Sequence, residues 1–261
     1  MTILDKIVAN KRVELESYKQ ALPLEVLKMV PNFSRECLSM KQALVNSDTG
    51  IIAEFKRRSP SRGFIHEGAD VQLIVGGYEK NGASAISILA DKDFFAGGPM
   101  DMQLARNTVT NTPLLFKEFV TDEYQLYLAK ASGADAVLLI ASVLEQAVCN
   151  RFASLAKDLG LEVLLELHTQ EEIAYVQPNV DMVGINNRNL KTFEVDLNES
   201  IKLCSLVPES YVKIAESGLN SPETVKLLRQ KGFSGFLMGE YFMKKQDPAE
   251  ALNRFIKSLK L

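Results

Sequence analysis

The sequence has 261 residues, of which 46% are hydrophobic, enough apolar side chain for one large domain. Its net charge of −3 gives no basic field for nucleic acid, and without a run of ~18 apolar residues no membrane span is expected. The cysteines Cys37, Cys149 and Cys204 form no CxxC pair, which excludes a disulfide framework, and His66 and His168 lie in no HExxH-type spacing, so no metal site is expected.

The first 48 residues are predicted to form a helical extension. Leu4, Ile7 and Val8 recur at helical spacing behind the capping pair Thr2 and Asp5. Two more pieces with apolar periodicity follow, at 24–29 and 37–45. The segment mixes acidic and basic residues and has no apolar stretch before a small-residue cleavage site, so we expect no signal peptide. With three unpaired cysteines, this favours a cytoplasmic protein.

From residue 51 onward, short apolar runs alternate with longer amphipathic stretches. Strands are predicted at 51–55, 84–89, 113–119, 135–140, 162–167, 181–186, 211–216 and 234–239. Helices are predicted near 68–81, 101–109, 122–132, 143–159, 170–177, 198–206, 222–230 and 248–258. Near-continuous apolar strands separated by helices indicate a parallel sheet that helices cover.

Eight such repeats in about 210 residues fit a closed (β/α)8 or TIM barrel. We therefore expect a single domain over 1–261, with the helical extension at 1–48 and the barrel at 51–261. An open, doubly wound sheet is the alternative. No GxGxxG follows the first strand, so the dinucleotide-binding form of that fold loses support.

Charged and amide side chains fall at the C-terminal ends of the predicted strands, although such groups are costly in a buried strand. They are Glu54, Lys56, Lys117, Glu166, Asn186, Arg188 and Glu216. Each shares the parity of an apolar or glycine position two residues or more before it, so a barrel can bring all of them into one mouth. One such residue alone is more often a solvated rim residue. The set, at the face where barrels carry their chemistry, predicts an active site with perturbed acid–base groups.

Three loops supply further candidates. Ser217 and Gly218 follow the seventh strand, and Gly239 and Glu240 follow the eighth, where barrels often bind phosphate through backbone N–H groups. The loop 59–63 could close over the mouth, or be a plain surface loop. The loop after the second strand and the end of the third strand carry aromatic residues that could line a pocket for an aromatic substrate, namely Phe94, Phe95 and Phe119. His168 lies beyond Glu166, and we expect it to be a rim residue.

Several motifs together resemble the indole-3-glycerol-phosphate synthase family. They are EFKRRSPSRG (54–63), SILADKDFFAGG (87–98), FKEF (116–119), GADAVLLI (133–140), LLELH (164–168), GINNRNLKTFEVD (184–196) and AESG (215–218). The resemblance implies conversion of 1-(2-carboxyphenylamino)-1-deoxyribulose 5-phosphate to indole-3-glycerol phosphate in tryptophan biosynthesis. It also implies release of carbon dioxide and water, a phosphorylated small-molecule substrate, and no cofactor or metal.

The resemblance also implies roles for the strand-end residues. Lys117 would be the general acid for ring closure, and Glu166 its partner in the later dehydration. Lys56 and Glu54 would assist, with Lys56 also contacting substrate anions. The other implied roles are substrate binding by Ser59, Asn186 and Arg188, completion of the floor by Glu216 and Ser217, backbone contacts to phosphate from Gly218, Gly239 and Glu240, and a sandwich of the aromatic ring by Phe94 or Phe95 with Phe119.

Three departures from the family pattern stand out. Glu118 replaces the usual aspartate but points to the opposite face, so we expect little effect. Gly98 replaces a serine, and Glu240 stands where some members have serine. The alternatives are a barrel like phosphoribosylanthranilate isomerase and a catalytically silent barrel that acts as a binding subunit. A monomer and a weak homodimer both remain open.

Overall fold

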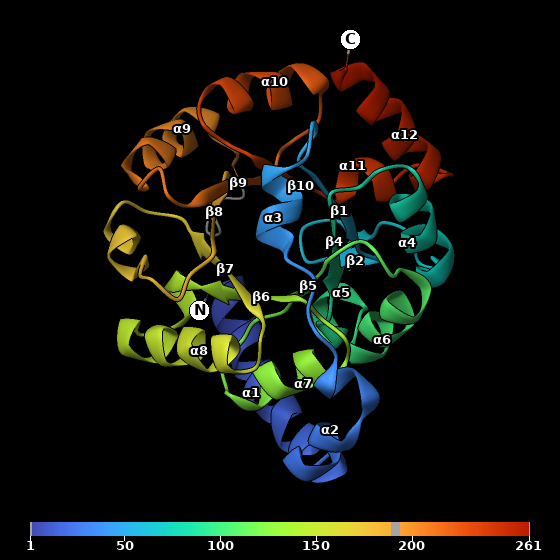
Figure 1. Cartoon of the computed structure of the whole chain (residues 1–261), viewed down its shortest axis with the longest axis vertical. Helices are drawn as coiled ribbons and strands as arrows, with labels where there is room; N and C mark the ends of the chain where they lie inside the picture. The colour runs from blue at the N-terminus through green and yellow to red at the C-terminus, as the bar shows by residue number, and fades with distance from the viewer. Residues whose placement is uncertain (1, 189–193, 261) are drawn as a thin grey trace.

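The computed structural model describes residues 2–188 and 194–260, in which parallel strands close into a barrel (Figure 1). In chain order the strands are β1 (Ile51–Phe55), β4 (Ala85–Leu89), β5 (Leu114–Lys117), β6 (Ala136–Ile140), β7 (Glu162–Leu167), β8 (Met182–Asn186), β9 (Val212–Glu216) and β10 (Gly235–Met238). Each pairs with its neighbours in that order, and β10 pairs with β1. The predicted TIM barrel is confirmed, and the open sheet is wrong.

An outer ring of helices covers the strands (Figure 1). Its members are α4 (Val71–Lys80), α6 (Pro99–Thr108), α7 (Tyr124–Ala131), α8 (Gln146–Asp158), α9 (Leu197–Leu206), α10 (Pro222–Gln230) and α12 (Pro248–Leu259). Several begin at a side-chain cap, for example Asp70 before α4 and Ser221 before Pro222 of α10. None of the described helices is long and apolar enough to cross a membrane.

The connections hold short elements that were not predicted, among them a hairpin and two short helices. The hairpin consists of β2 (Arg58–Ser59) and β3 (Gly63–Phe64), and the helices are α5 (Lys92–Phe95) and α11 (Glu240–Met243). The helix predicted at 170–177 is a short 3-10 helix, η3 (Glu171–Tyr175). Pro178 explains its length, because the residue before a proline is pushed out of the helical region and short helical pieces favour the tighter turn.

Side-chain parity divides the barrel into an outer and an inner core. Residues such as Ile51 and Phe116 pack outward against the helices, whereas Ile52, Leu115 and Ile214 fill the inside. Gly184 also faces inward: a Cβ at this position would lie 2.2 Å from Glu216 Oε1. Inward parity therefore continues from the apolar floor to the charged residues at the strand ends, as predicted.

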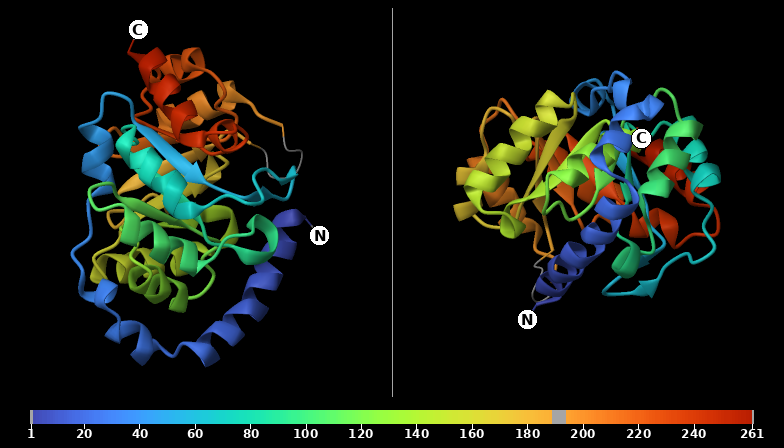
Figure 2. Two further views of the ribbon diagram at one scale, coloured as in Figure 1. Left: turned by 90° about the vertical axis from the view of Figure 1, so that its right-hand side faces the viewer. Right: turned by 90° about the horizontal axis from the view of Figure 1, so that it is seen from below.

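The N-terminal extension contacts both ends of the barrel (Figure 2). It comprises α1 (Ile3–Ala21), α2 (Leu24–Met29), η1 (Pro31–Ser34) and α3 (Met40–Val45). Thr2 and Asp5 form the predicted capping box at the start of α1. Met40 and Leu44 of α3 join the inner core and fill the N-terminal end of the barrel. The start of α1 lies across the C-terminal mouth, where Leu4 and Ile7 line the cavity described next.

Candidate active site

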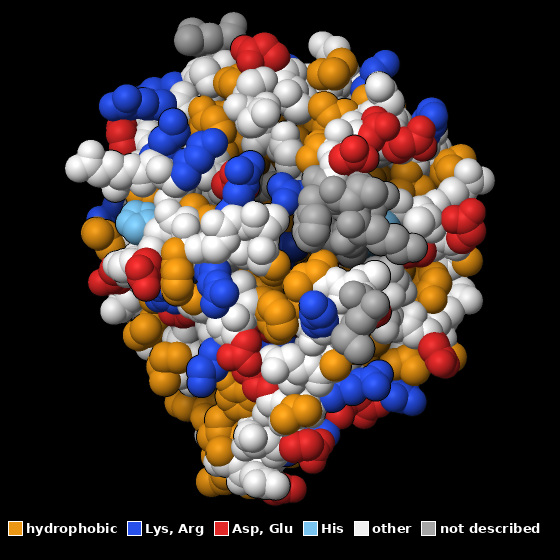
Figure 3. Space-filling model, turned by 180° about the vertical axis from the view of Figure 1, so that it is seen from behind, with side chains coloured by type: hydrophobic (Ala, Val, Ile, Leu, Met, Phe, Trp, Pro, Cys, Tyr) orange, Lys and Arg blue, Asp and Glu red, His pale blue; other side chains and the backbone are white. Residues whose placement is uncertain are grey.

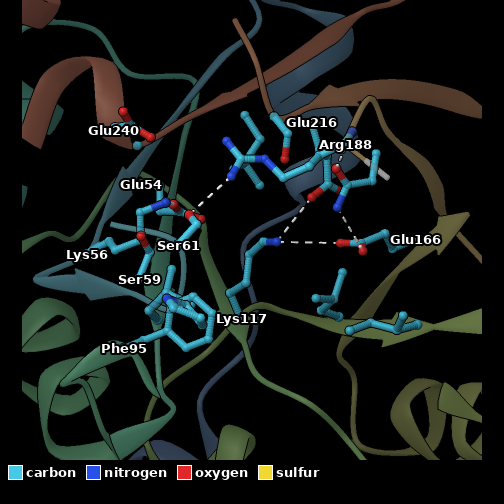
Figure 4. Close-up of a pocket in the computed structure, with 18 of the residues that line it drawn as sticks. Glu54, Lys56, Ser59, Ser61, Phe95, Lys117, Glu166, Arg188, Glu216 and Glu240 are labelled. Atoms are coloured by element: carbon cyan, nitrogen blue, oxygen red, sulfur yellow. Dashed lines mark hydrogen bonds and ion pairs between the residues drawn. The ribbon is translucent and has the colours of Figure 1, made fainter. Parts of the chain in front are cut away.

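The C-terminal mouth of the barrel holds a cavity that the strand-end residues line (Figure 4). It brings together the predicted residues Glu54, Lys56, Ser59, Phe95, Lys117, Phe119, Glu166, Asn186, Arg188, Glu216, Ser217, Gly218, Gly239 and Glu240. Phe94 is not among the lining residues, so of the two neighbouring phenylalanines only Phe95 reaches the cavity. On the face turned away from the viewer in Figure 1, lysine and arginine side chains gather toward the centre (Figure 3).

Lys117 is the centre of the cavity's charge network. Its Nζ lies 3.1 Å from Glu216 Oε2 and 3.5 Å from Glu166 Oε2. Burial lowers the pKa of Lys117, but the facing carboxylates outweigh burial and raise this pKa well above the ordinary lysine value. Lys117 therefore remains a cation inside the cavity.

The two carboxyl groups beside Lys117 differ in their proton affinity. Burial raises the pKa of Glu216 to about 8, because the attraction of Lys117 is smaller and Glu166 adds repulsion. Burial also acts on Glu166, but Lys117, His168 and Asn186 outweigh it and hold the pKa of Glu166 well below its usual range. The site thus places a carboxyl group of raised pKa beside one of lowered pKa, a pairing suited to acid–base work.

A second ion pair lies at the end of β1, where Lys56 Nζ is 2.6 Å from Glu54 Oε1. Only glycine fits at position 239, at the end of β10, because Glu54 occupies the space that a side chain would need. A Cβ at Gly239 would lie 2.3 Å from Glu54 Oε1. Gly218, after β9, has a φ of +72° and approaches Val195 closely.

The β2–β3 hairpin folds over the mouth as a partial lid. Arg188 Nη1 donates to Ser61 Oγ at 3.2 Å, which joins the hairpin to the end of β8. Arg62 lies 3.6 Å from Glu240 Oε1, so the Glu240 carboxylate is turned toward the hairpin. Beneath the lid the rings of Phe95 and Phe119 lie 6.0 Å apart at 33°. The cavity therefore has an aromatic side and a charged side.

Comparisons with known proteins show which family the chain belongs to. A sequence model described as "Indole-3-glycerol phosphate synthase" matches residues 4–255. A curated protein of that name from Bacteroides thetaiotaomicron is 51% identical over 257 residues, which is 98% of each chain. Another from Salinibacter ruber is 41% identical over 97% of this chain and 95% of its own. The chain belongs to the indole-3-glycerol phosphate synthase family.

Solved structures with low sequence identity share the barrel of this synthase family member. A thiamine phosphate pyrophosphorylase from Pyrococcus furiosus has a TM-score of 0.62 at 16% identity and covers 85% of this chain and 98% of its own. A mutant tryptophan synthase alpha-subunit from a hyperthermophile, Pyrococcus furiosus, has a TM-score of 0.61 at 15% identity, over 82% and 98%. These likenesses concern the fold alone.

The structure adds residues to the synthase site that sequence reasoning did not find. Ile3, Leu4 and Ile7 of α1 line its apolar side. His168, expected at the rim, is instead nearly buried, and its Nε2 lies 3.1 Å from Glu166 Oε1. Its parity with Glu166 was the available signal. Among residues 2–188 and 194–260, no three His, Cys, Asp or Glu side chains are grouped as a metal ion would require.

A buried charge cluster attaches α1 to this site. Lys11 Nζ lies 2.9 Å from both Asp91 Oδ2 and Glu118 Oε2 and also contacts Glu14. Asp91 caps α5 by accepting from Phe94 N at 2.7 Å. Glu118 has turned away from Lys117, as expected, but it is buried in an ion pair and not idle. Of the motif residues in GINNRNLKTFEVD, those at 189–193 lie outside the described residues.

Proposed function

We propose that this cavity converts 1-(2-carboxyphenylamino)-1-deoxyribulose 5-phosphate to indole-3-glycerol phosphate, with loss of carbon dioxide and water. The observation that carries the proposal is the buried Lys117 ammonium held between Glu166 and Glu216, next to the Phe95–Phe119 ring pair. It is supported by family membership along nearly the whole chain. The placement offers an acid and an aromatic slot within one closed mouth.

Ring closure requires an acid at the substrate carbonyl. The ring carbon that bears the carboxylate attacks the carbonyl carbon, and Lys117 gives a proton to the carbonyl oxygen as the C–C bond forms. A cation at this point also stabilises the developing negative charge on oxygen. The carboxylate then leaves as carbon dioxide, and its bonding electrons restore the aromatic ring.

Dehydration requires an acid and a base together. The new hydroxyl accepts a proton and leaves as water, while a base removes a proton from the carbon next to the ring nitrogen. We assign this work to Glu166 with the Lys56–Glu54 pair, because the ionised Glu166 faces the mouth and Lys56 is the second lysine of the cavity. Glu216 holds Lys117 in place through its 3.1 Å contact.

Substrate binding follows the division of the cavity into two sides. Phe95 and Phe119, which pack against each other, form the surface on which the aromatic ring rests, with α1 behind it. Ser59, Asn186 and Arg188 hold the carboxylate and sugar hydroxyls. For the phosphate we assign Lys56 with the loops after β9 and β10, at Ser217, Gly218, Gly239 and the backbone of Glu240.

The alternative readings have less support. Isomerisation in related barrels uses a cysteine and an aspartate at strand ends, and within the described part of the chain none of Cys37, Cys149 and Cys204 lines the cavity. A silent binding barrel would have lost its charged mouth residues, and all those predicted line the cavity.

A fluorescence assay tests the function. Purified protein mixed with the carboxyphenylamino-deoxyribulose phosphate is expected to generate indole absorbance and emission. The background is low because the chain has no tryptophan. A folded protein that produces no indole signal would refute the synthase activity. Release of indole signal together with carbon dioxide distinguishes synthesis from isomerisation, which releases none.

A further inference from the structure

The reaction consumes a proton that the active site must obtain from solvent. Two protons are given to oxygen, one at the carbonyl and one at the departing hydroxyl, and one is recovered from carbon. The remaining proton balances the carboxylate charge, which disappears when carbon dioxide leaves. Because Lys117 starts each cycle protonated and ends it one proton short, a route from solvent to Lys117 must exist.

Glu166 is placed to receive that proton, because its two oxygens face different groups. Oε2 lies 3.5 Å from Lys117 Nζ, whereas Oε1 lies 3.1 Å from His168 Nε2. The Asn186 amide also donates to Oε1 at 3.1 Å and fixes the carboxylate between them. One carboxylate thus connects the general acid to an imidazole.

His168 continues the connection away from the active site. Its Nδ1 lies 3.9 Å from Glu172 Oε2, and the Glu172 carboxylate accepts from the backbone N–H of Thr169 at 3.2 Å. Both ring nitrogens are shielded from solvent and have no aligned hydrogen bond in the described residues, so the ring must rotate to align each nitrogen with its carboxylate before a proton passes. His168 and Glu172 line a second hollow, and Asn186 and Arg188 line both this hollow and the active-site cavity.

We propose that His168 is a positioning residue for Glu166 and passes the consumed proton inward along the chain Glu172–His168–Glu166, an inference that rests on the proposed function. The Nε2–H bond of the imidazolium breaks as an O–H bond forms at Glu166 Oε1. A half-turn of the carboxyl group brings this proton to Lys117. The imidazole keeps its Nδ1 proton, so a flip of the ring then turns the bare nitrogen toward Glu172, where it takes up a proton from the second hollow.

The surrounding charges favour this direction of transfer. Burial lowers the pKa of His168, but its contact with Glu166 and the charges of Glu172 and Glu216 outweigh burial and raise this pKa above 6.5. In the resting site Lys117 keeps Glu166 ionised. When Lys117 has given up its proton that attraction ends, so Glu166 takes the imidazolium proton. The other charged residues around the second hollow are Arg188, Glu194, Asp196, Glu199 and Lys202.

The test compares His168→Gln with His66→Gln, because the chain has only two histidines. His66 lies 3.1 Å from Met243 O and has no part in the chain. Steady-state rates over many turnovers are followed by indole fluorescence with substrate in excess, because Lys117 must regain its proton before each new cycle. We expect His168→Gln to slow turnover by about tenfold or more, with KM changed less than about twofold, and His66→Gln to match wild type.

The pH profile separates proton transfer from a merely structural role. In wild type the rate should fall as pH rises through the pKa of His168, because the donor form is lost, and His168→Gln should lack this limb. Free imidazole should restore part of the rate of His168→Ala. Wild-type speed in His168→Gln, or slow turnover with an unchanged pH profile and no rescue, overturns the proposal.

A second measurement does not depend on turnover. The two imidazoles are resolved by NMR titration, and Glu166→Gln should lower the pKa of His168, because the ion pair that raises it is lost. An unchanged pKa for His168 overturns the relay. Failure of wild type to form indole would instead refute the proposed function, so the two failures are distinguishable.

Discussion

At the scale of single residues, Lys117 shows how a buried cation is kept charged. An isolated lysine in such a place would lose its proton, because burial disfavours the charged form. Here Glu216 and Glu166 lie within 3.5 Å and reverse that tendency. The same ammonium determines which of its two neighbours is ionised, so removing it changes three groups at once.

Lys117→Met is expected to lower the rate of indole formation by at least about 100-fold, because the acid for ring closure is lost while the side-chain volume is kept. Single-turnover fluorescence measures the loss, and a cooperative thermal transition shows that the barrel still folds. Lys80→Met, on the exposed end of α4, is the control and should match wild type. Activity near the wild-type level in Lys117→Met would remove Lys117 from the mechanism.

Parity along the strands predicted the charged residues of the mouth because strand geometry alone places alternate residues inside a barrel. It also applied to His168, which shares the parity of Glu166, but His168 follows the last strand residue and was therefore expected at the rim. It could not choose between Phe94 and Phe95. The unpredicted α5 decides this, since neighbours on a helix point in directions about 100° apart and only one can face the mouth.

At the scale of elements, α1 is attached to the mouth by one buried lysine. Lys11 is 2% exposed and binds carboxylates from two separate loops, Asp91 before α5 and Glu118 after β5. Asp91 in turn caps the helix that carries Phe95. Docking of α1 is thus coupled to the aromatic side of the cavity, which Leu4 and Ile7 complete.

Lys11→Met should therefore weaken both folding and substrate binding. Loss of one partner leaves buried carboxylates uncompensated, at a cost of about 3–5 kcal/mol of unfolding free energy. We expect KM to rise more than kcat falls, because α1 contacts the ring side and not the acid. The matched control is Lys19→Met on the same helix, whose partner Asp122 is half-exposed and whose loss should cost less than about 1 kcal/mol. Urea unfolding and steady-state kinetics measure both effects; equal effects of the two substitutions would contradict this account.

Sequence periodicity placed the long elements well and the short ones poorly. Strand and helix spans of five residues or more carry enough apolar repeats to be recognised. The two-residue strands β2 and β3 carry none, and their pairing depends on contacts such as Arg188 with Ser61, far away in the chain. The sequence alone therefore predicts only a loop at 59–63, and leaves open whether that loop closes over the mouth.

At the scale of the whole molecule, buried carboxyl groups should make folding sensitive to pH. Burial raises the pKa of Glu118 to about 7, although Lys11 opposes it, and that of Glu216 to about 8. Such groups bind their protons more tightly in the folded chain than in the unfolded one. Their stabilising effect is complete below an ordinary glutamate pKa and is lost as pH rises through the folded values.

The free energy of unfolding should accordingly fall between about pH 5 and pH 8. Glu118→Gln removes the contribution of Glu118 to this fall in unfolding free energy, roughly 3 kcal/mol across that range. The unfolding free energy of the variant should therefore depend less on pH. Urea unfolding at a series of pH values measures it. Glu25→Gln, on the surface of α2, should keep the wild-type slope. A Glu118→Gln profile parallel to wild type would show that Glu118 titrates alike in both states.

The extension that touches both ends of the barrel also has a consequence for the order of biosynthesis. It leaves the ribosome first, yet its binding partners come later: Asp91 and Glu118 for Lys11, Asp135 for Arg35, Glu162 for Ser39, and Ile214 beside Leu44. Most of the barrel must therefore be translated before α1 and α3 can dock. The extension, although made before the barrel, is thus among the last parts to reach its final position, and a nascent chain stopped before β9 would carry α3 undocked from the barrel interior.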